Sequence, residues 1–203
     1  AVATALPGGK NSNSKQFISI KRQATFSSKF SWNGQRLALD GLKLGLDNAS
    51  LHAQGTLTPR TQDWDGEARL LAPGLQASSQ GRLGPDAGQG QLNLAVDDGT
   101  ALARWLGGLP VVGQALGLAG GTPMPSGQGQ ATVQWDGGWR SPTLQLDAKA
   151  ALQQLTVPAT AASPTWGAQA LALALNGTAA QWQASASGQL HRDTLGAQLA
   201  VSL

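Results

Sequence analysis

The stretch GQGQATVQWDGGWRSPTLQLDAKAALQQLTV, residues 127–157, decides the fold class of this chain. Polar and apolar residues alternate up to Trp135, the turn signal Asp136-Gly137-Gly138 interrupts them, and the alternation then resumes. A period of two places successive side chains on opposite faces of a β-strand, and a glycine-rich break between two such runs is typical of a hairpin. The stretch therefore predicts two antiparallel strands, each with one apolar and one polar face.

The same alternation recurs along most of the remaining chain. It is found in the stretches QRLALDGLKLGLD, ASLHAQGTLT, DWDGEARLL, GQLNLAV, ALALALNG, QWQASASGQL and LGAQLAVSL. In the first of them the phase slips at Asp40-Gly41, as a β-bulge or a tight turn would allow. Roughly a dozen strands joined mainly by short turns are typical of an antiparallel meander. We therefore expect an all-β fold in which each strand has one apolar face.

One stretch breaks the alternation and predicts a short amphipathic helix near residues 98–108. In DDGTALARWLGGLP, Asp98 or Thr100 can cap the helix, apolar residues follow at helical spacing, and the Gly-Gly-Leu-Pro sequence ends it. The following VVGQALGLAGGTPMPSG reads as an apolar turn and then a linker. We expect the helix to plug or cap the apolar face through Leu102, Trp105 and Leu106.

The glycine- and proline-rich linker at about 119–127 separates two similar halves. GQGQLNLAVDDG in the first half resembles GQGQATVQWDGG in the second, which indicates a loosely repeated hairpin. We expect a first β-repeat section at 24–118 that ends in the helix, and a second at 127–203. Residues 1–23 are expected to form a strand or a disordered segment, and the whole to be one continuous domain.

The composition excludes several function classes. The 203-residue chain has a net charge of +3, only 12% charged residues and no cysteine, which excludes disulfides, thiolate metal sites and thiol nucleophiles. Residues 150–190 contain no Asp, Glu, Lys or Arg, a composition common in exported bacterial proteins. Residues 1–43 carry seven Lys or Arg against one Asp. This basic region is either a solvated strand pair or a weak contact for anionic lipid or nucleic acid.

No local constellation suggests catalysis, a metal or a cofactor. His52 and His191 are far apart in the sequence, on the polar phase of their strands or at its edge, and are expected at the surface. Asp63, Asp65 and Glu67 alternate along one strand but lack the oxygen cage and loop glycine of a calcium site. No nucleophile elbow, P-loop or dinucleotide fingerprint is present, and basic and aromatic residues rarely coincide. We therefore expect that the protein is neither an enzyme nor a nucleic-acid-binding protein, and that it binds no cofactor and no metal.

Several phrases together resemble the repeats of the TamB and AsmA-like family of bacterial envelope proteins. In that family a strand leads into a W-x-G-x-W-x-x-P turn and then into another alternating strand. The matching positions in this chain are Trp135, Gly137, Gly138, Trp139, Arg140 and Pro142. LAVDDGTALARWLGGLP resembles the short helical insertion of the family, and FSWNGQRLALDGLKLGLDNASLHAQGTL resembles another copy of the strand series. The resemblance covers most of residues 24–203.

This resemblance implies a fold, a location and a role. The implied fold is an elongated antiparallel sheet curled lengthwise into an open apolar trough, the β-taco. The implied location is the periplasm of a Gram-negative bacterium, with this chain a fragment of the β-repeat region and the inner-membrane anchor elsewhere in a longer parent. The implied role is a bridge that moves phospholipid between the inner and outer membranes. Implied partners are phospholipid acyl chains, neighbouring β-repeats of the parent and an Omp85-type outer-membrane barrel.

An apolar trough would lower the main barrier to lipid movement without any covalent chemistry. Exposing a methylene to water costs about 0.8 kcal/mol, so a 16-carbon chain costs roughly 12 kcal/mol. The residues expected to line the groove are Leu37, Leu39, Leu42, Leu44, Leu46, Leu51, Leu57, Leu70, Leu92, Leu94, Val96, Val133, Leu144, Leu146, Leu171, Leu173, Leu175, Leu199 and Val201. The alternative is a scaffold or chaperone for the assembly of outer-membrane β-barrel proteins, with a filled core and an edge that binds extended peptide.

Overall fold

The structure is a computed structural model that describes residues 24–46, 48–116, 118, 124–159, 164–178, 180–192 and 195–203. The predicted N-terminal segment 1–23 lies outside these residues, as does most of the predicted linker. Both predicted β-repeat sections are described, and a single sheet runs through them.

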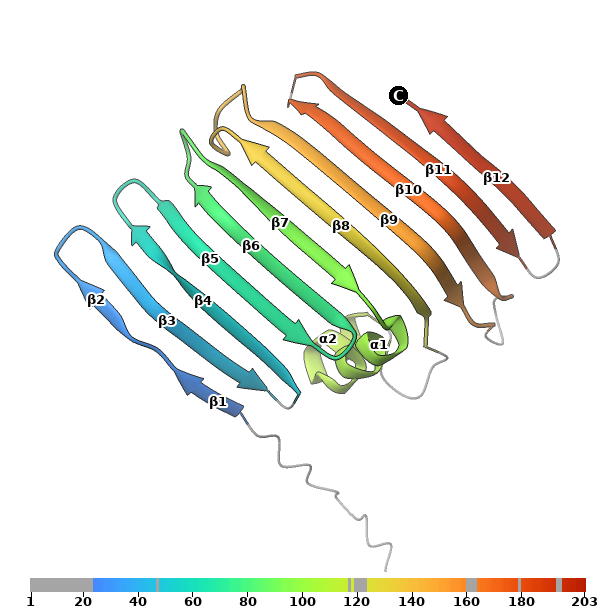
Figure 1. The fold of residues 1–203 in the computed structure, drawn as a ribbon, viewed down its shortest axis with the longest axis horizontal. Coiled ribbons are helices and arrows are strands. Elements are labelled where there is room, and N and C mark those ends of the chain that lie inside the picture. The colour runs from blue at the N-terminus through green and yellow to red at the C-terminus, as the bar shows by residue number, and fades with distance from the viewer. Residues whose placement is uncertain are drawn as a thin grey trace, which may run out of the picture.

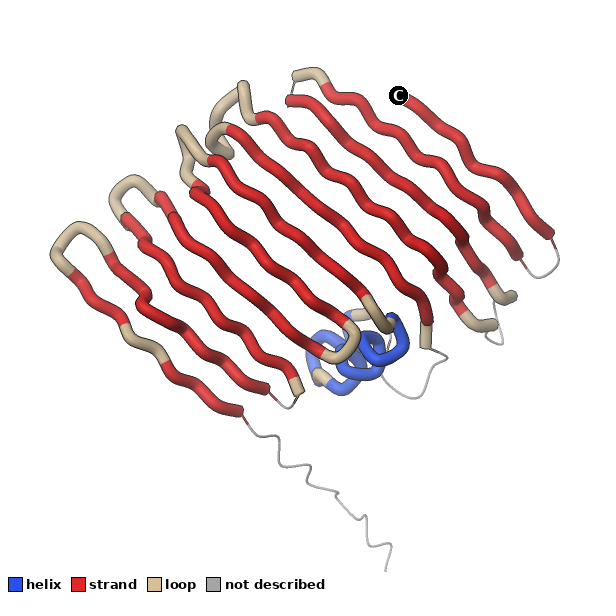
Figure 2. Tube along the Cα trace, in the orientation of Figure 1, coloured by secondary structure: helices blue, strands red, loops and turns tan. Residues whose placement is uncertain are grey.

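The chain forms one antiparallel sheet with two short helices at one end of its strands (Figure 1 and Figure 2). From β3 onward each strand pairs with its sequence neighbours, so the sheet is a meander, and the predicted antiparallel β fold is confirmed. β1 and β2 both pair with β3. The elements are β1 Ala24–Ser27, β2 Phe30–Trp32, β3 Leu37–Leu46, β4 Ala49–Thr58, β5 Asp63–Ala72, β6 Leu75–Leu83, β7 Gln89–Val96, α1 Gly99–Gly108, α2 Pro110–Ala115, β8 Ser126–Asp136, β9 Gln145–Val157, β10 Trp166–Thr178, β11 Trp182–Arg192 and β12 Leu195–Ser202.

The strand register places the apolar residues of neighbouring strands on the same side of the sheet. Residues opposite each other in an antiparallel pair share a face, and the next residue along each strand lies on the other face. We call one side the apolar face; one of its cross-strand rows is Leu44, Leu51, Leu70, Ala77, Leu94, Ala131, Ala150, Leu173, Ala186 and Val201. We call the other side the polar face; one of its rows is Lys43, His52, Arg69, Ser78, Asn93, Thr132 and Lys149.

The phase slip predicted within β3 is a bulge. The pairing of β3 with β4 shifts between Leu39 and Leu42, and Gly41 has a φ of 129°. Glycine adopts this positive φ without steric cost. The bulge returns the leucines on both of its sides to the apolar face, so this prediction is confirmed.

A row of glycines crosses four neighbouring strands on the apolar face, beside two tryptophan rings. A Cβ on Gly55 or Gly66 would lie 2.7 or 2.8 Å from Cζ2 of Trp64, and a Cβ on Gly90 would overlap the ring of Trp135. Both rings therefore approach the glycine backbone closely, in the way that aromatic residues cover glycines in sheets. The row consists of Gly55, Gly66, Gly81 and Gly90.

The predicted helix is present as α1, and a second helix follows it. Asp98 is the N-cap, with Oδ1 accepting a hydrogen bond from the backbone N–H of Ala101 at 3.0 Å. The interpretation of the next stretch as an apolar turn is wrong, because residues 110–115 form α2. Pro110 begins this helix, a position where its missing N–H has no cost.

The sheet is open and uncurled, so the lengthwise curl into an open apolar trough that the family resemblance implies is not confirmed. Curvature in sheets comes from bulges and glycine kinks placed at matched positions on successive strands. Among the described strand pairs only three show a register shift, namely β3 with β4, β8 with β9 and β10 with β11. The long runs of regular pairing between them leave the sheet spread out.

Candidate functional site

The apolar face is not sealed by a second layer of the described chain. Its apolar side chains are mostly half-buried by their in-sheet neighbours. Among the described residues, the buried core consists of three alanines, Ala49 and Ala168 in the sheet and Ala103 in α1. A sealed core of this size would bury many large side chains. In the part of the chain that the structure describes, the apolar face is therefore available to a ligand or partner.

The register places all but one of the predicted groove-lining residues on this face. Those on β3 to β7 are Leu37, Leu39, Leu42, Leu44, Leu46, Leu51, Leu57, Leu70, Leu92, Leu94 and Val96. Those on β8 to β12 are Val133, Leu146, Leu171, Leu173, Leu175, Leu199 and Val201. Alternation within each strand and the antiparallel register together produce this arrangement.

Leu144 lies outside the strands, in the connection between β8 and β9, where its N–H bonds to the Ser141 carbonyl at 3.1 Å. This connection docks on the turn between β6 and β7. Trp139 N–H donates to the Gly84 carbonyl at 3.1 Å and Arg140 N–H to the Pro85 carbonyl at 2.9 Å. The W-x-G-x-W-x-x-P pattern thus forms a turn that is hydrogen-bonded to the β6–β7 turn. For this reason β9 begins only at Gln145, after Leu144.

The apolar face is hollowed over β8 to β12. The hollow measures about 390 Å³, within the range of small ligand sites. Leu173, Leu175 and Val201 stand around it with 42%, 39% and 46% of their surfaces exposed. The sequence analysis did not include the alanines that line this hollow, although they lie on the same alternating phase as the leucines. They are Ala131, Ala148, Ala150, Ala184 and Ala186.

Helix α1 lies over one end of the apolar face. Leu102 and Leu106 line a small cavity of about 220 Å³ with Val96, Leu152 and Leu155. Close approach needs small residues, and a Cβ on Gly99 would lie 3.0 Å from the backbone of Gly127. These contacts place two of the three predicted plug residues against the end of the sheet.

Trp105, the third predicted plug residue, has a buried indole Nε1 with no hydrogen-bond partner. Trp139 lies in the connection between β8 and β9, and the remaining tryptophans lie toward the ends of strands. Trp135 Nε1 donates to the Arg82 carbonyl at 3.0 Å, which fixes its ring over the glycine row. At the margin of the apolar face the guanidinium of Arg192 lies 5.5 Å from the centre of the Trp166 ring, a cation–π distance.

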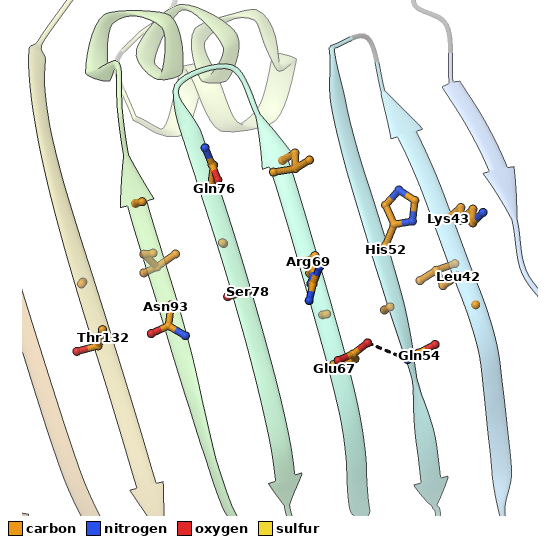
Figure 3. A pocket seen from close by; sticks show the side chains of 18 of the residues that line it. Leu42, Lys43, His52, Gln54, Glu67, Arg69, Gln76, Ser78, Asn93 and Thr132 are labelled. Carbon is orange, nitrogen blue, oxygen red and sulfur yellow. Dashed lines mark hydrogen bonds between the residues drawn. The ribbon is translucent and has the colours of Figure 1, made fainter.

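The polar face carries most of the charged side chains of the strands, and it has a depression of about 930 Å³ (Figure 3). Lys43, His52 and Arg69 lie on adjacent strands, and Gln54 Nε2 donates to Glu67 Oε1 at 2.8 Å. The depression is the gap between long polar side chains standing on an open sheet, which fits a solvated surface. Two of the predicted groove-lining residues, Leu42 and Leu94, are also among the residues that line it.

The acidic residues of β5 behave as a solvated row. Asp63 pairs with Arg82 at 3.1 Å and accepts a hydrogen bond from the Thr61 hydroxyl at 2.7 Å. The Thr61 hydrogen bond is the main cause that lowers the pKa of Asp63 below its ordinary 3.8. Within the described ranges no three His, Asp or Glu residues gather closely enough to hold a metal ion. His52 and His191 lie on the polar face, on distant strands.

Comparison with protein-family models, with curated proteins and with solved structures gives no match. The likeness to the TamB and AsmA-like repeats therefore rests on the motifs alone. None of the helices in the described ranges has both the length and the apolar character needed to cross a lipid bilayer.

Proposed function

We propose that the apolar face binds phospholipid acyl chains, and that this chain is a periplasmic section of a bridge-like lipid-transfer protein of the TamB and AsmA-like kind. One observation carries the proposal. Every strand from β3 to β12 contributes apolar residues to the same face of the sheet, and no second layer of the described chain covers this face. Contiguous exposed apolar surfaces of this kind mark interaction sites for apolar partners.

The dimensions of the face suit hydrocarbon. The sheet path has eleven strand positions, which at about 4.8 Å per strand extend roughly 48 Å. Transfer of a 16-carbon chain from water onto a fully covering apolar surface would recover roughly 12 kcal/mol. An open face covers one side of the chain, so the recovered free energy is a fraction of this value. A shallow and uniform surface also lets a lipid move on, because no deep pocket holds it.

In this proposal, the sheet curls lengthwise into a trough when lipid is bound. Curling the open sheet around acyl chains would cover their second side and bring leucines of distant strands into one lining. Neighbouring β-repeats of a longer parent would lengthen the path, and an inner-membrane anchor and an Omp85-type outer-membrane barrel would mark its two ends. The scaffold alternative would use a different feature, the margins of the sheet at β1 and β12, which pair on one side only among the described residues and would pair with an extended peptide.

A pair of adjacent single-cysteine variants tests acyl-chain binding. Val133 lies on the apolar face and Thr132 on the polar face of the same strand, and the chain has no native cysteine. We would label Val133→Cys and Thr132→Cys with an environment-sensitive fluorophore and titrate a short-chain phosphatidylcholine below its micelle concentration. The proposal expects a saturable blue shift at position 133 and none at 132.

Equal responses at the two positions, or none at either, would overturn the proposal. A response at neither position to lipid, together with binding of an unfolded outer-membrane barrel peptide, would favour the scaffold function instead. Circular dichroism of both labelled variants controls for unfolding.

A further inference from the structure

The apolar face narrows at β7 and β8, because other parts of the chain border it at both ends of these strands. At one end the ring of Trp135 reaches from β8 over β7, where a Cβ on Gly90 would overlap it. The hydrogen bond of its indole Nε1 to the Arg82 carbonyl, at 3.0 Å, holds the ring there. At the other end lies α1, which forms the small cavity together with Val96 of β7 and Gly129 of β8.

Between these two borders each strand has two apolar positions. They are Leu92 and Leu94 on β7, and Ala131 and Val133 on β8, which pair with each other across the two strands. We call these four residues the passage. Side chains on one face of a strand repeat every two residues, so two positions span roughly 14 Å along the strand. The passage leads into the hollow, because its two β8 residues also line that hollow.

Beyond β9 the apolar face is wider. The sheet residues that line the cavity beneath α1 all belong to β7, β8 and β9. Further along the hollow, none of the residues described in α1 is part of the lining. The next apolar positions after Leu173 and Val201, which are Leu171 and Leu199, therefore extend the face there. The hollow thus has a third apolar position on a strand where the passage has two.

We propose that the passage makes the apolar face selective for lipids with two acyl chains over lipids with four, such as cardiolipin. Carbon atoms in contact lie about 3.5–4.0 Å apart, so two acyl chains side by side need roughly 9 Å and four need roughly 18 Å. The width of the passage therefore suits two chains. A four-chain lipid in the passage would leave two chains in water, whereas the wider hollow covers more of them, so such a lipid should avoid the passage. This inference rests on the proposed function, because it requires acyl chains to bind this face.

Photo-crosslinking with two anionic lipids tests the selectivity. We would compare a short-chain phosphatidylglycerol with a short-chain cardiolipin, each carrying a photoreactive diazirine near the end of one acyl chain and each used below its micelle concentration. Peptide mass spectrometry would compare adducts in the passage with adducts at Leu173, Leu175 and Val201 in the hollow. Phosphatidylglycerol is expected to label both places. Cardiolipin is expected to label the hollow and to lose the passage adducts.

Two pairs of matched variants test which residues set the width. Trp135→Leu removes the ring from Gly90 and should restore cardiolipin adducts in the passage, whereas Trp64→Leu, beside the same glycine row but on β5, should not. Ala131→Phe fills the passage and should remove the phosphatidylglycerol adducts from its other residues. Ala186→Phe lies in the same cross-strand row but on β11, and should leave them in place. Circular dichroism checks that the variants fold.

The results separate this inference from the proposed function. Equal labelling of the passage by both lipids would overturn the selectivity and leave acyl-chain binding intact. Unchanged cardiolipin labelling in a folded Trp135→Leu would do the same. If that variant does not fold, Ala131→Phe decides, because phosphatidylglycerol adducts that persist in its passage would overturn the inference. Absence of apolar-face adducts from both lipids would overturn the proposed function together with the inference.

Discussion

Leu173→Glu separates an open apolar face from a sealed interior. Leu173 lies on the apolar face of β10, beside the hollow, and 42% of its surface is exposed. Full burial of a leucine side chain contributes about 1.5–3 kcal/mol, and slightly more than half of this one is covered. We therefore expect the substitution to lower the free energy of unfolding by about 1–2 kcal/mol. In a sealed core the loss would be about 2–5 kcal/mol from packing alone, with the cost of a buried carboxylate in addition.

The control is Ala172→Glu, which adds the same charge to the next residue of the strand, on the polar face. Urea denaturation of the two variants measures stability, and titration with a fluorescent acyl-chain probe measures binding. Leu173→Glu should stay folded and bind the probe about tenfold more weakly, because hydrocarbon at that position must desolvate the carboxylate. Ala172→Glu should leave binding unchanged. Unfolding of Leu173→Glu, or equal binding by both variants, would refute the reasoning.

Three further predictions concern stability and charge. Gly90→Ala should lower the free energy of unfolding by about 1–3 kcal/mol, because the added methyl group would overlap the Trp135 ring. The control Gly196→Ala places its methyl group in open space and should change this free energy by less than about 0.5 kcal/mol. Equal effects of the two substitutions in denaturant titrations would contradict the prediction. Thr61→Val should raise the pKa of Asp63 toward 3.8, as NMR titration can show. The lowered pKa stabilises the fold above pH 3.8, and this contribution is lost as the pH falls through the folded-state pKa, so the stabilities of the variant and the parent should converge in acid. Asp98→Ala removes the cap of α1 and should cost about 1 kcal/mol, with faster amide exchange in its first turn; unchanged exchange would argue against the cap.

Local alternation was sufficient to predict the sheet and its two faces. A period of two fixes which side chains share a side, whatever the neighbouring strand is. The same reasoning located the bulge at Asp40-Gly41, because a phase slip with glycine has few other solutions, and it identified Asp98 as a possible helix cap. These features are local, so the sequence contains them directly.

Features that depend on cross-strand register could not be predicted in this way. The row of four glycines beside Trp64 and Trp135 becomes visible only when four strands are aligned. Curling of the sheet depends on where bulges fall in successive strands, which alternation does not specify. Helix α2 was missed because Pro110 was interpreted as a stop, although proline is equally suited to the first turn of a new helix. Leu144 fits the alternation, but the docked turn before β9 keeps it out of the strand.

The most direct test of the central claim is to map where a bound acyl chain lies. The chain would be incubated with a phospholipid that carries a photoreactive diazirine near the end of one acyl chain, irradiated, digested and analysed by peptide mass spectrometry. The account predicts adducts on apolar-face residues around the hollow, above all Leu173, Leu175 and Val201. Adducts on the polar face at Lys43, Arg69 or Thr132, or no adducts at saturating lipid, would contradict it.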